Sequence, residues 1–269
     1  MRDRLAGRRP LFVAEAPVME HAVLVLQQAI GPDLAVAVLE APRTAGRAQP
    51  GQFVHVRVEE LPLRRPFSVY QAAGGRLEIL YRIKGRGTTR MARWVSGADV
   101  DLVGPLGHGF APPAAGERVV LVGGGIGVAP LVFYGARYPE SCVAIAGFGT
   151  AAEVGVVERL VQVGVATQVT TVDGSAGPAG LVTAPLAAQL SADPSRIDRI
   201  LACGPEPMLA AVARLAEQHD VPCEVALERE MACGTGVCLG CVAPTSDPEH
   251  PYLRVCTDGP VVPAERVRW

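Results

Sequence analysis

The sequence lacks a strong charge of either sign. Of its 269 residues only 19% are charged, and the formal net charge is -2. A protein of this composition has no basic field able to hold nucleic-acid phosphates or an anionic membrane surface, so neither is an expected partner. The hydrophobic fraction of 49% suffices for two domains and a small further segment, each with a buried core.

Long hydrophobic runs are also missing. The first 26 residues are basic, but Glu15, Pro17 and Glu20 interrupt their apolar stretches, and no small-residue cleavage site follows, which argues against a signal peptide. Residues 119–133 form the most apolar stretch elsewhere, yet they contain four glycines and a proline and are shorter than the roughly 20 residues that span a bilayer. We therefore expect a cytoplasmic protein, with an N-terminal extension over residues 1–17.

The cysteines do not suit a disulfide framework. There are seven, an odd number, and four of them lie in the last 37 residues. This crowding favours a metal site in a reducing compartment. Cys142 and Cys223 lie beside apolar segments and are expected in the core.

Residues 18–112 read as a β domain. Runs rich in Val, Leu and Ile at 34–39, 53–58 and 77–83 are separated by turn signals such as Gly74-Gly75, which predicts the strands of a barrel or a sandwich. A short helix is expected over 88–94. The small, proline-rich stretch 111–116 marks a domain boundary.

Residues 117–225 alternate between apolar runs and helix-like segments, which predicts a parallel sheet with helices on both faces. The expected strands are 118–122, 142–148, 167–172 and 200–202, and the expected helices are 129–138, 152–163, 183–190 and 207–219. Residues 226–269 break this pattern, being rich in Cys and Gly at first and ending, over 252–262, with hairpin-like spacing. They form a third segment.

Two glycine-containing loops in the α/β region predict a dinucleotide site. The first strand leads into Gly123, Gly124, Gly125 and Gly127, and a later strand ends at Cys203 and Gly204. Glycines at a strand-to-helix turn let the backbone approach a pyrophosphate at a helix N-terminus, although the first loop taken alone also fits an ordinary tight turn. Together, GG-x-G-x-x-P and CGP-x-x-M resemble the nicotinamide-binding domain of the ferredoxin–NADP reductase superfamily.

The choice between NAD and NADP depends on the segment after the second strand of this domain. It carries Glu153 and no basic residue before Arg159. An acidic group accepts hydrogen bonds from free ribose hydroxyls, whereas a basic one favours a 2′-phosphate. Glu153 therefore favours NAD, although a solvated residue in a first helical turn would look the same.

Three segments of the β domain resemble the flavin-binding barrel of the same superfamily. They are Arg65-Pro66-Phe67-Ser68, Leu80-Tyr81-Arg82, and the glycine turn that includes Gly87 and Thr88. The first offers a cation for a pyrophosphate, an aromatic ring and a hydroxyl for the isoalloxazine edge. A GPLG-x-x-F turn at 104–110 also matches. The resemblance implies an antiparallel barrel that binds FAD, while the residues by themselves leave FMN open.

The terminal cysteines have the spacing C-x4-C-x2-C, and a fourth follows after 14 intervening residues. The four are Cys233, Cys238, Cys241 and Cys256. This is the plant-type [2Fe–2S] arrangement; a structural zinc site, which more often comes as two C-x2-C pairs, is the alternative. Cys203 is expected near the nicotinamide, and no residue is assigned to acid–base catalysis.

Across residues 18–262 the chain resembles the electron-transfer subunits of NAD-linked dihydroorotate dehydrogenase, because E-x-x-MACG-x-G-x-C-x-GC and Y-x-RVCTDGPV accompany the flavin and nicotinamide motifs. The resemblance implies a cytoplasmic oxidoreductase subunit of pyrimidine biosynthesis. Electrons would pass from the FMN of a catalytic partner through [2Fe–2S] and FAD to NAD, in a heterotetramer of two plus two subunits. Subunits of NADH-dependent ferredoxin:NADP reductase or sulfhydrogenase complexes, or a non-enzymatic zinc-binding module, are the alternatives.

Overall fold

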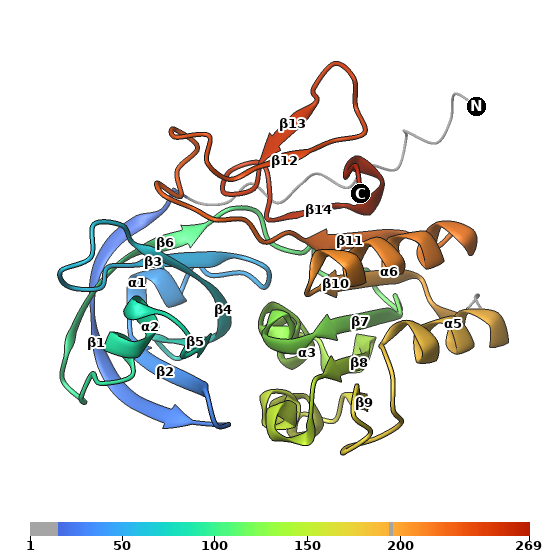
Figure 1. Cartoon of the computed structure of the whole chain (residues 1–269), viewed down its shortest axis with the longest axis horizontal. Helices are drawn as coiled ribbons and strands as arrows, with labels where there is room; N and C mark the ends of the chain where they lie inside the picture. The colour runs from blue at the N-terminus through green and yellow to red at the C-terminus, as the bar shows by residue number, and fades with distance from the viewer. Residues whose placement is uncertain (1–15, 194–195) are drawn as a thin grey trace.

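The computed structural model describes residues 16–193 and 196–269, so most of the extension predicted at residues 1–17 lies outside the described residues. Figure 1 shows the barrel on the left, the α/β part on the right, and the C-terminal segment, in red, across the top of both. Within the described ranges, no helix is both long enough and apolar enough to cross a membrane.

Six antiparallel strands form a closed barrel in the order β1-β2-β5-β4-β3-β6. Side chains alternate between the interior and solvent along β1, as the pleat of a strand requires. The strands predicted at 34–39, 53–58 and 77–83 are confirmed as β2, β3 and β5. The elements are β1 Val18–Ala29, β2 Leu34–Glu40, α1 Pro42–Ala45, β3 Phe53–Val56, β4 Arg65–Ala73, β5 Arg76–Arg82, α2 Arg86–Met91 and β6 Asp99–Leu106.

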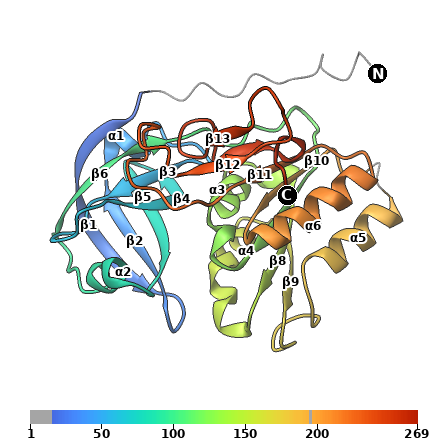
Figure 2. The ribbon, with the colours of Figure 1, turned by 45° about the horizontal axis from the view of Figure 1, so that its top comes forward.

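The second sheet has the order β14-β11-β10-β7-β8-β9 and is parallel except for β14. One hydrophobic cluster packs α5 and α6 on one face, and another packs α3 and α4 on the other, which confirms helices on both faces (Figure 2). The elements are β7 Val119–Gly124, η1 Gly125–Val128, α3 Ala129–Arg137, η2 Pro139–Ser141, β8 Cys142–Phe148, η3 Ala151–Val157, α4 Glu158–Gln162, β9 Ala166–Thr171, α5 Thr183–Ala192, β10 Arg199–Cys203, α6 Glu206–Gln218 and β11 Cys223–Ala226.

The last segment differs from the hairpin expected over 252–262. β13 (Tyr252–Arg254) pairs with β12 (Val242–Pro244), whereas β14 (Val261–Pro263) pairs antiparallel with β11 of the large sheet; η5 (Ala264–Arg266) follows. The physical reason is burial. Val261 and Val262 are 2% and 1% exposed and belong to the cores on opposite faces of the sheet.

The barrel and the α/β part share a core. Leu34, Tyr70 and Leu80 of the barrel belong to the same hydrophobic cluster as Val156 and Leu160. The Tyr70 hydroxyl donates to the Val156 carbonyl at 2.9 Å. An ion pair of 3.0 Å joins Arg159 to Glu78. These contacts fix the barrel against the sheet.

Candidate electron-transfer site

The two glycine-containing loops of the predicted nicotinamide site touch each other. β7 and β10 are neighbours, with Cys203 opposite Gly123. A Cβ atom at Gly127 would lie 2.6 Å from the Gly204 Cα, and one at Gly124 would lie 2.5 Å from the Met208 sulfur. Only glycine permits this approach, so the two loops predicted from separate motifs meet at the carboxyl edge of the sheet, where ligands bind in open parallel sheets.

Glu153 is part of a contact between the barrel and the sheet. One carboxylate oxygen forms an ion pair with Arg82, and the other accepts the Gly149 N–H at 2.9 Å. Arg82 also pairs with Asp33 at 2.5 Å. The predicted ribose acceptor and one predicted flavin residue thus bind each other, a pairing of residues 71 positions apart that the sequence did not indicate.

A second carboxylate, Asp173, follows the neighbouring strand β9 and was missed in the sequence. Its Oδ1 accepts from the Ser175 N–H at 3.0 Å and hydroxyl at 2.6 Å, and these bonds lower the pKa of Asp173. The Ser175 hydroxyl in turn accepts the Ala151 N–H at 2.8 Å. Asp173 is exposed and lies at the carboxyl end of the sheet. The available signal was an Asp-Gly-Ser turn directly after an apolar run.

Cys203 is buried rather than open to the crevice. It is 2% exposed, and burial, together with the nearby Glu228 carboxylate, raises the pKa of Cys203 well above its ordinary value. A thiol of this kind is a poor nucleophile. Glu228 itself lies two residues past β11, and surrounding protein raises its pKa although the side chain is open to solvent. Lys84 is the nearby cation, and its charge opposes the rise in the pKa of Glu228.

The predicted flavin residues Arg65 and Gly87 also come together. All four side chains from Arg65 to Ser68 are half-buried along β4. A Cβ atom at Gly87, in the first turn of α2, would lie 3.2 Å from the Arg65 Nε. The Thr88 hydroxyl accepts the Lys84 and Gly85 N–H groups at 3.1 and 3.2 Å.

Tyr81 and Arg82 have different surroundings. The Phe67 and Tyr81 rings meet edge to face at 6.0 Å, while the Tyr81 hydroxyl is buried with no partner among the described residues. Leu80 is core. Of these predicted flavin residues, Phe67 is half-buried, Leu80 and Tyr81 are buried, and Arg82 is engaged by two carboxylates.

The four C-terminal cysteines lie in one loop region as two sulfur pairs, Cys233 with Cys238 and Cys241 with Cys256. Backbone N–H groups point at their sulfurs over 3.2–3.5 Å, and the donors are Thr235, Gly236, Cys238, Gly240 and Cys256. Gly234 and Gly236 have φ values of +70° and +82°, which glycine adopts without strain.

These sulfurs differ in proton affinity. Burial opposes the thiolate of Cys233, yet the N–H groups of Thr235 and Cys238 lower the pKa of Cys233 to about 6. Burial, then the adjacent Cys241 sulfur, raises the pKa of Cys256 to about 12. A bound cation would hold all four as thiolates. Within residues 16–193 and 196–269, no group of three or more His, Cys, Asp or Glu side chains is close enough to hold a single metal ion. Two cysteine pairs with N–H···S bonds therefore fit a two-iron cluster better than one zinc ion.

The cysteine loop has an inner and an outer side. On the inner side, Gly234 lies against the ring of His55 in β3: a Cβ there would be 2.7 Å from the Cε1. On the outer side Cys238 is exposed, and its neighbours Val237 and Leu239 are 81% and 59% exposed. The loop thus lies between the outer face of β3 and the molecular surface.

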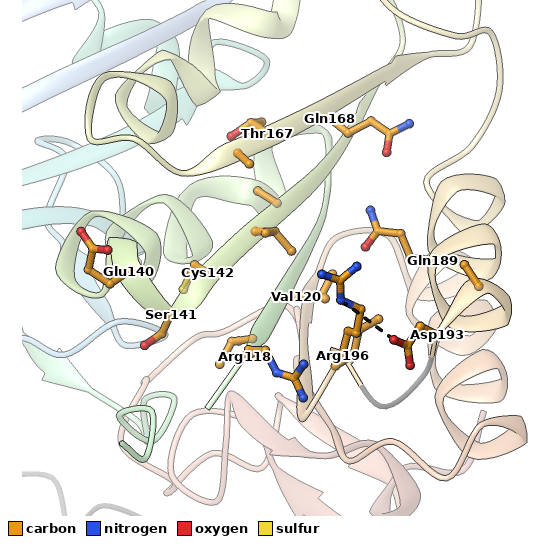
Figure 3. Close-up of a pocket in the computed structure, with 16 residues that line it drawn as sticks. Arg118, Val120, Glu140, Ser141, Cys142, Thr167, Gln168, Gln189, Asp193 and Arg196 are labelled. Atoms are coloured by element: carbon orange, nitrogen blue, oxygen red, sulfur yellow. Dashed lines mark ion pairs between the residues drawn. The ribbon is translucent and has the colours of Figure 1, made fainter. Parts of the chain in front are cut away.

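A groove of about 710 Å³ lies at the other end of the large sheet (Figure 3). It is lined by the amino ends of β7, β8 and β9 and by α5, and Arg196 and Asp193 pair beside it at 4.0 Å. Because the glycine loops are at the carboxyl edge, this groove is not part of the predicted nucleotide site.

Comparison with known families and proteins gives consistent matches. Residues 228–268 match the family described as the iron-sulfur cluster binding domain of dihydroorotate dehydrogenase B. The chain is 40% identical over 256 residues to the dihydroorotate dehydrogenase B (NAD(+)) electron transfer subunit of Shouchella clausii (strain KSM-K16), covering 91% of this chain and 96% of that protein. It is 42% identical over 229 residues to the subunit of the same name from Bacillus caldolyticus, covering 81% and 86%.

Solved structures share the fold. A chain from the structure of an NADH-dependent reduced ferredoxin-NADP oxidoreductase, described in connection with flavin-based electron bifurcation, superposes with a TM-score of 0.82 at 29% identity, covering 93% of this chain and 90% of that one. The ferredoxin reductase of carbazole 1,9a-dioxygenase superposes with a TM-score of 0.64 at 23% identity, covering 78% and 68%.

Proposed function

The chain belongs to the family of electron transfer subunits of NAD(+)-dependent dihydroorotate dehydrogenase B, and on this premise we propose that it passes electrons from the FMN of a catalytic partner through [2Fe–2S] and FAD to NAD in pyrimidine biosynthesis. The observation that carries the proposal is the cysteine loop, which contacts the barrel on one side and is exposed on the other. A flavin exchanges single electrons with a cluster and hydride with nicotinamide.

Each of the three predicted segments would bind one redox group. Residues 18–112 would hold FAD through Arg65 to Ser68 and the turn at Gly87 and Thr88. Residues 117–225 would hold NAD through the loops at Gly123–Gly127 and at Cys203 and Gly204. Within residues 226–269 the four cysteines would hold the cluster. Glu153 remains a predicted ribose ligand, which would require release from Arg82.

We propose that the partner docks on the exposed apolar rim around Cys238. Val237, Leu239, Val242 and Tyr252 all lie in the C-terminal segment and are between 38% and 81% exposed, and exposed apolar side chains that gather in one region mark protein–protein contacts. A partner covering this rim would bring its own redox group next to the cluster and exclude water from the path. The relatives' name, electron transfer subunit, agrees with a separate catalytic subunit.

Turnover of separated and combined subunits tests the function. The isolated chain should contain iron, sulfide and FAD and reduce dyes with NADH, but should not oxidise dihydroorotate. Adding the catalytic subunit encoded by the same genome should restore dihydroorotate-dependent NAD reduction. Dihydroorotate oxidation by the isolated chain would refute the division of labour, and coupling only to a ferredoxin:NADP reductase partner would favour the related complex.

A charged residue on the rim tests the docking surface. Leu239→Asp should weaken capture of the catalytic subunit at least tenfold while the visible spectrum of the cluster is retained. Val95→Asp is the matched control, because Val95 is 73% exposed on the barrel, outside the rim. Equal effects of both changes would contradict the assignment. A two-plus-two heterotetramer is our proposed assembly, to be checked by light scattering, and a cytoplasmic location remains a prediction.

A further inference from the structure

One buried polar atom stands between the predicted flavin strand and the cysteine loop. His55 in β3 is 1% exposed, and its Nε2 has no hydrogen-bond partner among the described residues. Leaving a buried polar group unpaired costs about 1–3 kcal/mol, and nearly all such groups in proteins have a partner. The nitrogen therefore indicates a partner that the polypeptide itself does not provide.

One face of the His55 ring lies against the cysteine loop. A Cβ atom at Gly234 would lie 2.7 Å from Cε1, 2.9 Å from Nδ1 and 3.0 Å from Nε2. Gly234 immediately follows Cys233 and has a φ of +70°, so any other residue would be both strained and in collision with the ring. The loop is therefore built to lie against this imidazole.

The opposite side of His55 belongs to the barrel. His55 is the cross-strand neighbour of Pro66 in the predicted flavin strand β4, and its ring meets Phe53 edge to face at 5.8 Å. Burial, followed by the charge of Arg64, lowers the pKa of His55 to about 4. A neutral imidazole has one N–H donor and one acceptor.

A bound cluster would supply the missing acceptor. The hydrogen bonds described above to the four cysteine sulfurs all come from backbone N–H groups within the C-terminal segment. Hydrogen bonds to the sulfurs of an iron–sulfur cluster stabilise its reduced, more negative state and so set its reduction potential. His55 adds a side chain of suitable chemistry from the barrel, at the same loop.

We propose that His55 donates its Nε2–H to a sulfur of the bound cluster and thereby raises the reduction potential of the cluster. This inference rests on the proposed [2Fe–2S] site. His55 is a positioning residue: it orients the loop over the barrel and tunes the cluster, and it exchanges neither protons nor electrons with substrate.

Redox titration of the purified holo-protein, followed by electron paramagnetic resonance, tests the proposal. His55→Leu should shift the ratio of reduced to oxidised cluster at a fixed ambient potential about tenfold toward oxidised, which is 59 mV for a one-electron couple. His55→Gln, which retains an N–H donor, should recover most of the shift. Phe53→Leu, which changes the adjacent ring without removing a donor, should leave the potential unchanged.

A measurement on the unaltered protein does not depend on how the variants fold. With 15N-labelled histidine, the reduced cluster should show a 15N hyperfine coupling and an exchangeable proton that is lost in D₂O. An intact cluster without this coupling, or a His55→Leu variant with the wild-type potential, would overturn the role of His55. The absence of any cluster signal would instead refute the cluster assignment itself.

Discussion

Substitution of Gly127 by alanine should separate the two loops of the nicotinamide site. The added Cβ would lie 2.6 Å from the Gly204 Cα, 2.8 Å from the Gly204 nitrogen and 3.1 Å from the Cys203 carbonyl carbon. All three are backbone atoms, which cannot rotate away. Ordinary carbon contacts are about 3.5–4.0 Å, so the loops must move apart by about 1 Å.

A displacement of this size has a large expected effect on hydride transfer, because a misplacement of about 1 Å can cost about 100-fold in rate. We expect kcat/KM for NADH-driven dye reduction to fall by about that factor, while overpacking lowers the free energy of unfolding by about 1–3 kcal/mol. The visible spectra of flavin and cluster should be retained, since neither predicted site includes these loops.

The matched control is Gly164→Ala. Gly164 has a φ of +86° and no atom within 4 Å of its Cβ position, so alanine there adds backbone strain without a collision. It should reduce stability but leave kcat/KM unchanged. Wild-type kcat/KM in Gly127→Ala would refute the reasoning, as would loss of flavin and cluster together with activity.

Three further changes test other parts of the structure. Arg199→Met should lower the free energy of unfolding by about 3–5 kcal/mol in urea titrations, because it removes the buried cation between Glu117 and Glu224, at 3.1 and 3.3 Å; a loss below about 1 kcal/mol would contradict this. Glu228→Gln should raise Tm at pH 8 but not below about pH 4. The pKa of Glu228 is raised in the folded protein, so ionisation of this carboxyl destabilises the folded state as the pH rises through that pKa. The same difference in Tm between variant and wild type at both pH values would disprove this. Asp173, exposed after β9 at the carboxyl end of the sheet, is a second candidate acceptor for the ribose hydroxyls of NAD. Asp173→Asn should therefore weaken NADH binding about tenfold, as loss of a bond to a charged group predicts, without weakening NADPH binding; equal loss for both would exclude this role.

Local patterns in the sequence predicted much of the fold. Runs rich in Val, Leu and Ile, bounded by turn residues, identified strands such as β2 and β5, and alternation of apolar runs with helical segments identified the parallel sheet. Segment 152–163 was expected as one helix, but the structure has the 3-10 helix η3 followed by the short α4. Gly155 lowers the helix propensity of this segment, and its contacts with the barrel fix its path.

Residues whose roles depend on distant partners could not be found in this way. The Arg82–Glu153 pair joins residues that no local pattern connects, and it changes the interpretation of both. His55 is one ordinary position in an apolar strand, and only the approach of Gly234 distinguishes it. The cysteines were predictable because loop spacing alone constrains a cluster, whereas the course of β14 depended on where two valines could be buried.

The pairing of β14 with β11 has a consequence for the architecture of the C-terminal segment. Residues 227–260 leave the large sheet after β11 and return to it at β14, so they are an excursion anchored at both ends and not a free tail. Truncation after residue 227 would remove the cysteines and also uncover β11 as an open edge, available to strands of other molecules. Preparations without the cluster segment should therefore aggregate. The segment that carries the cysteines thus also protects the edge of the large sheet, through the strand β14 that follows it.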